Sequence, residues 1–113
     1  MAHYRVNIVK SEVTGEYKVR PGIQFLDEGD TVRWFNRKPD ASKDPAKISF
    51  PNGHPFTQDP SGESLNAGDS SATYHVRSGV SSNPPVRYAY KVSLTGIPKV
   101  HGQPCQSDPE FDV

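Results

Sequence analysis

The prolines and glycines of this chain are the feature that most limits its fold. Eleven prolines and nine glycines are spread at short intervals along 113 residues. Because proline interrupts helical hydrogen bonding, no window of about 12 residues or more keeps an uninterrupted apolar stripe of helical period. The sequence therefore disfavours helix almost everywhere and leaves short extended segments as the main local structure.

Apolar and polar residues alternate with period two, as in strands that bury one face. Pairs expected to share a buried face are Val6 with Ile8, Val32 with Trp34, and Tyr74 with Val76. The longest alternating run is VRYAYKVSL, with Tyr88, Tyr90, Val92 and Leu94 on one face. Trp34 is expected in the core, because a chain with few aliphatic residues needs large aromatic side chains to fill it.

Polar turn signals rich in glycine and proline separate these runs at 13–16, 20–22, 27–30, 66–69, 83–85 and 107–110. About seven short strands joined in this way predict an all-β fold, an antiparallel Greek-key β-sandwich that spans residues 1–113 as a single domain. Two long irregular stretches, 37–47 and 51–67, are expected to be loops that are either functional or mobile.

The charges of the chain argue against two classes of partner. The 13 basic and 13 acidic side chains cancel, so no net positive field draws the protein to nucleic acid or to an anionic membrane. No apolar run is long enough to insert into a membrane. The first residues lack the apolar segment of a secretory signal, which predicts a cytoplasmic protein as written, or a periplasmic or secreted one if this is a mature chain.

Three segments in order resemble a cupredoxin. YKVRPGIQFLDEGDTVRWFN (17–36) is similar to a strand ending in proline that leads through a Gly-Asp turn into a strand closing with an aromatic and an asparagine. LNAGDSSATYHV (65–76) resembles the turn of that family and the strand after it. VRYAYKVSL (86–94) with DPEFDV (108–113) resembles the last two strands, the first of which carries the copper-binding cysteine at its end.

The resemblance also implies that the copper site is missing. A blue-copper centre needs two imidazoles and a thiolate, with a weak axial methionine or oxygen. The position of the cysteine falls on Val92 and that of the first histidine on Ala46, while the second is expected within 93–98, where no histidine occurs. The only methionine is Met1. The implied protein is a cupredoxin-like module with no cofactor, no catalytic residues and no enzymatic activity.

A displaced metal site is the alternative. His101 and Cys105 lie in the loop before the last expected strand, and His54 lies in the second long loop. Two imidazoles and a thiolate would suit copper or zinc, with Asp108 or a water completing the shell. The competing interpretation is that Cys105, the only cysteine, is a small residue tucked under its loop beside Pro104.

If the chain has no catalytic or metal site, we expect it to act by recognising an unknown protein partner or as a structural subunit. Arg37 and Lys38 begin a loop of alternating charge, and His54 and Phe56 lie in FPNGHPF, where Phe56 either covers a sheet end or is an exposed binding anchor. A third hypothesis is an enzyme that uses the titratable groups of this second loop, His54, Asp59 and Glu63.

Overall fold

The structure is a computed structural model that describes residues 1–10, 16–37, 45–94, 100–103 and 108–113. Within these ranges the chain forms strands and one 3-10 turn, which confirms the expected lack of α-helix. The elements in order are β1 (His3–Lys10), β2 (Tyr17–Arg20), β3 (Ile23–Phe25), β4 (Thr31–Asn36), β5 (Ala46–Ser49), η1 (Pro60–Gly62), β6 (Ser64–Leu65), β7 (Tyr74–His75), β8 (Arg87–Ala89), β9 (Lys91–Ser93), β10 (His101–Gly102) and β11 (Glu110–Asp112). No helix in the described ranges is long and apolar enough to cross a membrane.

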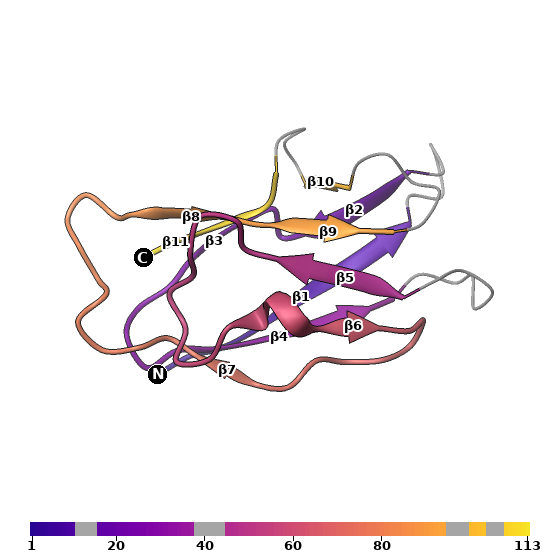
Figure 1. Ribbon diagram of the computed structural model, residues 1–113. Coiled ribbons are helices and arrows are strands. Elements are labelled where there is room, and N and C mark those ends of the chain that lie inside the picture. Colours follow the sequence, from indigo (N-terminus) through magenta and orange to yellow (C-terminus); the bar gives the residue numbers. More distant parts are fainter. Residues whose placement is uncertain (11–15, 38–44, 95–99, 104–107) are drawn as a thin grey trace.

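These strands form one five-stranded sheet and two three-stranded sheets. The five-stranded sheet has the order β10-β2-β1-β4-β7, and the smaller sheets have the orders β3-β11-β8 and β6-β5-β9. β8 and β9 follow each other along the chain, so the two small sheets are joined at Tyr90. In Figure 1, β5 and β9 lie across β1 and β2 of the large sheet. The inner faces of the large and small sheets together supply the buried core.

The expectation of purely antiparallel sheets is wrong. β1 pairs in parallel with β4, β10 with β2, and β11 with β3, while the remaining pairs are antiparallel. The physical reason lies at Pro21 and Gly22, where the chain leaves the large sheet after β2 and forms β3 in a small sheet. When it returns as β4 it lies beside β1, from which β2 and β3 separate it in the sequence, so no tight hairpin forces the pair to be antiparallel.

Several expected strands are divided in the structure. VRYAYKVSL forms β8 and β9 in different sheets, and the stretch 51–67, expected to be irregular, contains η1 and β6. The predicted turns at 27–30 and 66–69 are confirmed, with Gly29 and Gly68 at φ of 86° and 88°. A positive φ is readily available to glycine, and this explains why these turns need it. Residues 38–44 of the first long stretch lie outside the described residues.

Trp34 is the centre of the core, as its alternation with Val32 predicted. It is fully buried, and its ring makes edge-to-face contacts with five aromatic rings at centroid distances of 5.6–6.2 Å. These rings belong to Phe50, Phe56, Tyr74, Tyr90 and Phe111. Phe111 belongs to β11 and Trp34 to β4, so the cluster joins the large sheet to the small ones. Aromatic side chains therefore supply much of the contact between the two layers.

A close approach of two glycines fixes β10 against the crossover after β2. A Cβ on Gly22 would lie 2.6 Å from the backbone nitrogen of Gln103, and one on Gly102 would lie 2.9 Å from the Cα of Gly22. The Gly22 N–H donates to the Gln103 carbonyl, and its own carbonyl accepts from the Glu110 N–H. Gly22 thus joins β10 and β11 to the chain at the point where it changes sheets.

We expect Gly22→Ala to lower the free energy of unfolding by about 2 kcal/mol, because the added methyl group meets backbone atoms that cannot rotate away. Urea denaturation measures the change. Gly62→Ala is the matched control, since a Cβ there would have no heavy atom within 4 Å. Equal stability of the two variants would contradict the packing described here.

Candidate functional site

The positions that the cupredoxin resemblance assigns to copper ligands carry hydrocarbon side chains. Val92 lies in β9 beside β5 and exposes 4% of its surface, and Ala46 at the start of β5 is fully buried. In the described part of 93–98, Ser93 and Leu94 provide no imidazole. A soft thiolate and neutral imidazoles are what blue copper requires. The residues at this end of β5 and β9 therefore do not fit the metal.

His54 is engaged in the local structure of the loop after β5. Its Nδ1 accepts a hydrogen bond of 3.1 Å from the Phe56 N–H, and its Nε2 lies 4.0 Å from Oδ1 of Asp59. Its ring is stacked on that of Phe56 with nearly parallel planes, at a centroid distance of 6.2 Å. These contacts indicate that His54 stabilises the conformation of its own loop.

His101 lies in β10, opposite Lys18 of β2 at the edge of the large sheet. Its Nδ1 is buried and has no hydrogen-bond partner in the described part of the chain. The contacts of His54 are with Phe50, Phe56 and Asp59, whereas His101 is paired with Lys18, and no contact among the described residues joins the two histidines. Cys105 lies outside the described residues. Among the residues that are described, no three His, Cys, Asp or Glu side chains form a group that could hold a metal ion.

Of the binding residues that the sequence suggested, Phe56 is the one that the structure corrects. It exposes 1% of its surface and packs against Trp34, so it covers the core and cannot be a surface anchor. The cause is its backbone pairing with Val76, which turns the ring inward. Lys38 lies outside the described residues. Arg37 is described and exposed, directly after β4.

Arg37 belongs to a group of residues on the outer face of the large sheet. Three guanidinium carbons lie over the ring of Phe35, at 4.8 Å for Arg5, 5.3 Å for Arg33 and 5.5 Å for Arg37. We call Arg5, Arg33, Phe35 and Arg37 the arginine–phenylalanine patch. A cation over an aromatic face is attracted by the negative face of the ring, worth about 0.5–1 kcal/mol at an exposed site.

Strand register brings the patch together. Arg33 and Phe35 share the outer face of β4, because alternate residues of a strand point the same way. The parallel pairing of β1 with β4 then sets Arg5 directly opposite Arg33, and Asn7 opposite Phe35. The inner neighbour Trp34 is buried in the core, so the patch lies on the opposite side of the same strand.

Neutral groups hold two of the arginines in place. Arg33 donates from Nε to the Ser71 carbonyl at 3.2 Å and from a terminal nitrogen to Oγ of Ser70 at 2.7 Å. Arg37 donates from Nε to Oδ1 of Asn7 at 3.0 Å. Since a guanidinium has five N–H groups, both side chains keep donors for another molecule.

The charged side chains on the strands of the large sheet are all basic. None of its five strands contains an aspartate or a glutamate, although the chain has 13 acidic residues. Within the described residues, no carboxylate lies within ion-pair distance of the three patch arginines. Arg5 and Arg33 are like charges placed directly across from each other, which is unfavourable in a sheet. A negative group that bound there would relieve this repulsion.

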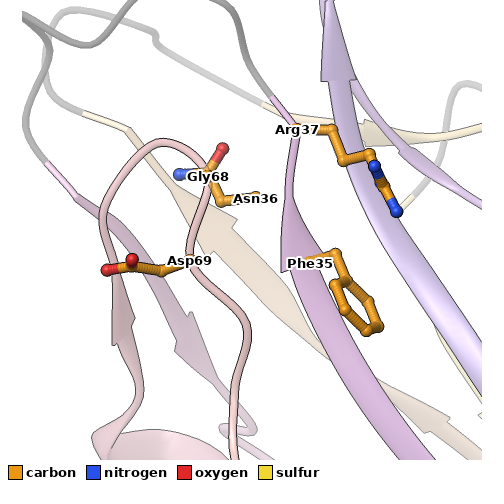
Figure 2. Close-up of a pocket in the computed structure, with 5 residues that line it drawn as sticks. All are labelled: Phe35, Asn36, Arg37, Gly68 and Asp69. Carbon is orange, nitrogen blue, oxygen red and sulfur yellow. The ribbon is translucent and has the colours of Figure 1, made fainter.

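A small pocket adjoins the patch. It has a volume of about 180 Å³ and is lined by Phe35, Asn36, Arg37, Gly68 and Asp69. Figure 2 shows the side chains of Phe35 and Arg37 extending to the same side of β4, whereas the Asp69 carboxylate points away from Arg37. Pockets for whole small molecules usually have volumes of about 300–1,000 Å³. The dimensions of this pocket fit a single amino-acid side chain.

The groups of the enzyme hypothesis have structural partners. Asp59 caps η1 by accepting from the Ser61 N–H at 2.9 Å, and this bond lowers the pKa of the exposed Asp59 carboxyl. Glu63 accepts hydrogen bonds from the Tyr74 hydroxyl and, at 3.3 Å, from the Ala72 N–H. None of these groups lines the pocket beside Arg37.

The most perturbed carboxyl group lies on the other layer. Glu110 in β11 is 7% exposed, and its burial, with Asp112 beside it on the same strand face, raises its pKa to about 7. Arg87 of β8 lies 2.8 Å from the Glu110 carboxylate and opposes this shift. Two carboxyls and one arginine are too few and too mixed in charge for a metal site.

No family model and no curated protein sequence matches the chain. The candidate site therefore rests on geometry. Sequence analysis found Arg37 and missed Arg5, Arg33 and Phe35. The sequence RWFNR (33–37) could have indicated that Arg33, Phe35 and Arg37, which occupy every second position, share one face of a strand. The position of Arg5 beside them depends on the parallel pairing of β1 with β4.

Proposed function

We propose that this chain is a Greek-key β-sandwich of the cupredoxin-like type that has neither a metal centre nor a catalytic centre and acts by binding another protein. The order of its elements supports the fold. β2 ends at Arg20 before Pro21, a Gly29–Asp30 turn leads into β4, and β4 closes with Phe35 and Asn36. The same features of the sequence carried the resemblance.

One observation carries the metal-free part of the proposal. At Val92 and Ala46 the structure has closely packed hydrocarbon where the family would have a thiolate and an imidazole. A metal ion placed there would lose its water ligands without gaining donor atoms. The alternative site of His54, His101 and Cys105 is disfavoured by the contacts of the two histidines, since His54 contacts Phe56 and Asp59 whereas His101 is paired with Lys18.

The binding part of the proposal is supported by the arginine–phenylalanine patch. Its donors are not saturated by the described part of the chain, and its sheet has no acidic residue. Arginine is among the residues most enriched at the energetic centres of protein interfaces. Structural partners for Asp59 and Glu63 support the absence of enzymatic activity.

Metal analysis tests the proposal. After expression in medium supplemented with copper and zinc and extensive dialysis, we expect less than about one metal ion per ten chains, because the described residues offer no set of ligands. Elemental analysis of the wild type and of Cys105→Ser measures the content. One tightly bound ion per wild-type chain that is lost in Cys105→Ser would overturn the proposal and establish the copper or zinc alternative.

A further inference from the structure

We infer that the arginine–phenylalanine patch binds an extended acidic segment of a partner protein, with carboxylates at alternate residues along one face. This inference rests on the proposed binding function and names the chemistry of the partner. The observation that supports it is the placement of three guanidiniums over the Phe35 ring, on a sheet whose strands contain no acidic residue.

The spacing of the arginines matches an extended peptide. Arg33, Phe35 and Arg37 follow one another at alternate positions, so their Cα atoms are separated by about 6.6 Å at each step. A peptide in extended conformation repeats its side chains on one face with the same spacing. A segment that lies along β4 can therefore direct one carboxylate to Arg33 and another to Arg37. Arg5, opposite Arg33 on β1, provides a second donor group for the first carboxylate.

Pre-organisation favours binding at this place. The Phe35 ring and the bonds to Ser70, Ser71 and Asn7 hold two of the guanidiniums before a ligand arrives. Less side-chain freedom is then lost on binding than with unrestrained arginines. Carboxylates bind arginine through two parallel charge-assisted hydrogen bonds, and this paired geometry fixes the orientation of the carboxylate relative to the guanidinium.

The observations favour an acidic protein over a nucleic acid. Proteins that bind single strands without sequence preference use aromatic faces on which bases stack, but the Phe35 ring already has three guanidiniums over it. The chain also has no net positive charge to hold a long polyanion. The pocket of about 180 Å³ beside Arg37 has room for one side chain, which suits a peptide.

Binding of defined probes tests the inference. The first probe is a fluorescently labelled peptide of six Glu-Ser repeats followed by six serines, and the second has the same composition with a glutamate at every third residue, so that on one face of an extended chain its carboxylates lie six residues apart. Fluorescence anisotropy at 50 mM salt is expected to show the alternating peptide bound at least about threefold more tightly, because its carboxylates match the spacing of β4. Equal affinity for the two peptides would overturn the extended geometry.

Two sets of variants assign the binding to the patch. Arg5→Gln/Arg33→Gln is expected to weaken binding of the alternating peptide by about tenfold or more, since two charge-assisted contacts are lost. The control Arg77→Gln/Lys91→Gln removes the same charge at exposed positions outside the patch and is expected to change the affinity less than about twofold. Equal losses in both double variants would overturn the assignment.

Phe35→Leu serves as a second, independent variant if the double variant does not fold, as judged by circular dichroism. It keeps an apolar side chain but removes the ring that orients the guanidiniums, and a loss of about threefold is expected, with recovery in Phe35→Tyr. Unchanged binding in Phe35→Leu would overturn the role of the ring. Tighter binding of a thymidine 12-mer than of the alternating peptide would identify a nucleic-acid site instead. The metal analysis is independent of these results, so either proposal can fail alone.

Discussion

Trp34→Ala is expected to lower the free energy of unfolding by about 4 kcal/mol, the range found when a large buried aromatic is truncated. Trp34 is fully buried, and the truncation leaves a cavity at the centre of the five surrounding rings. Those rings come from both layers, so they cannot close the cavity without moving the sheets. Urea denaturation followed by circular dichroism measures the change, because the variant has no tryptophan to report it.

Two controls distinguish this effect from a general loss of apolar surface. Trp34→Phe retains an aromatic ring and is expected to cost less than half as much as the alanine variant. Phe25→Ala removes a ring that is 63% exposed and is expected to change stability by less than about 1 kcal/mol. A Trp34→Ala variant as stable as Phe25→Ala would contradict the placement of Trp34 at the centre of the core.

Wild-type stability is expected to fall by on the order of 2 kcal/mol as the pH rises from 5 to 8, and Glu110→Gln is expected to remove most of this fall. Burial of Glu110 and the adjacent Asp112 raise its pKa in the folded protein from the ordinary 4.5 to about 7. The folded state therefore binds this proton more tightly than the unfolded state. The stabilisation is complete below about pH 4.5, declines as the pH passes through 7, and is absent above that.

Denaturation of the wild type and Glu110→Gln at closely spaced pH values measures the effect. Asp112→Asn is the companion variant, because it removes the negative neighbour and is expected to reduce the dependence without abolishing it, since burial of Glu110 remains. The exposed Glu28→Gln is a control that should leave the slope between pH 5 and 8 unchanged. A wild-type stability that is flat across this range would show that Glu110 titrates normally.

Local pattern was enough to predict much of the fold. Alternation assigned Val32 and Trp34 to the inside, and glycine and aspartate marked the turn at 27–30. These predictions succeed because the direction of a side chain depends only on its place along its own strand. The pairing partner of a strand cannot be predicted in this way, because the alternation of apolar and polar residues is the same whether the neighbouring strand runs parallel or antiparallel.

The errors follow from that distinction. Nothing local in Arg5 or Arg33 indicates that they face each other, because this depends on the pairing of β1 with β4, two strands that are not consecutive in the sequence. Phe56 looked suitable for a surface because it lies among prolines and polar residues, yet its pairing with Val76 turns it into the core. The sequence therefore predicted one member of the patch, Arg37, and could not predict the group.

The contact between Gly22 and Gly102 also has an evolutionary consequence. In most packed pairs, a gain of volume at one position can be offset by a loss at the other, so substitutions can accumulate in steps. Here each residue faces the backbone of the other segment, and neither can become smaller. A mutational path that enlarges one position has no compensating step at its partner, so both positions should resist substitution independently wherever this crossover is retained.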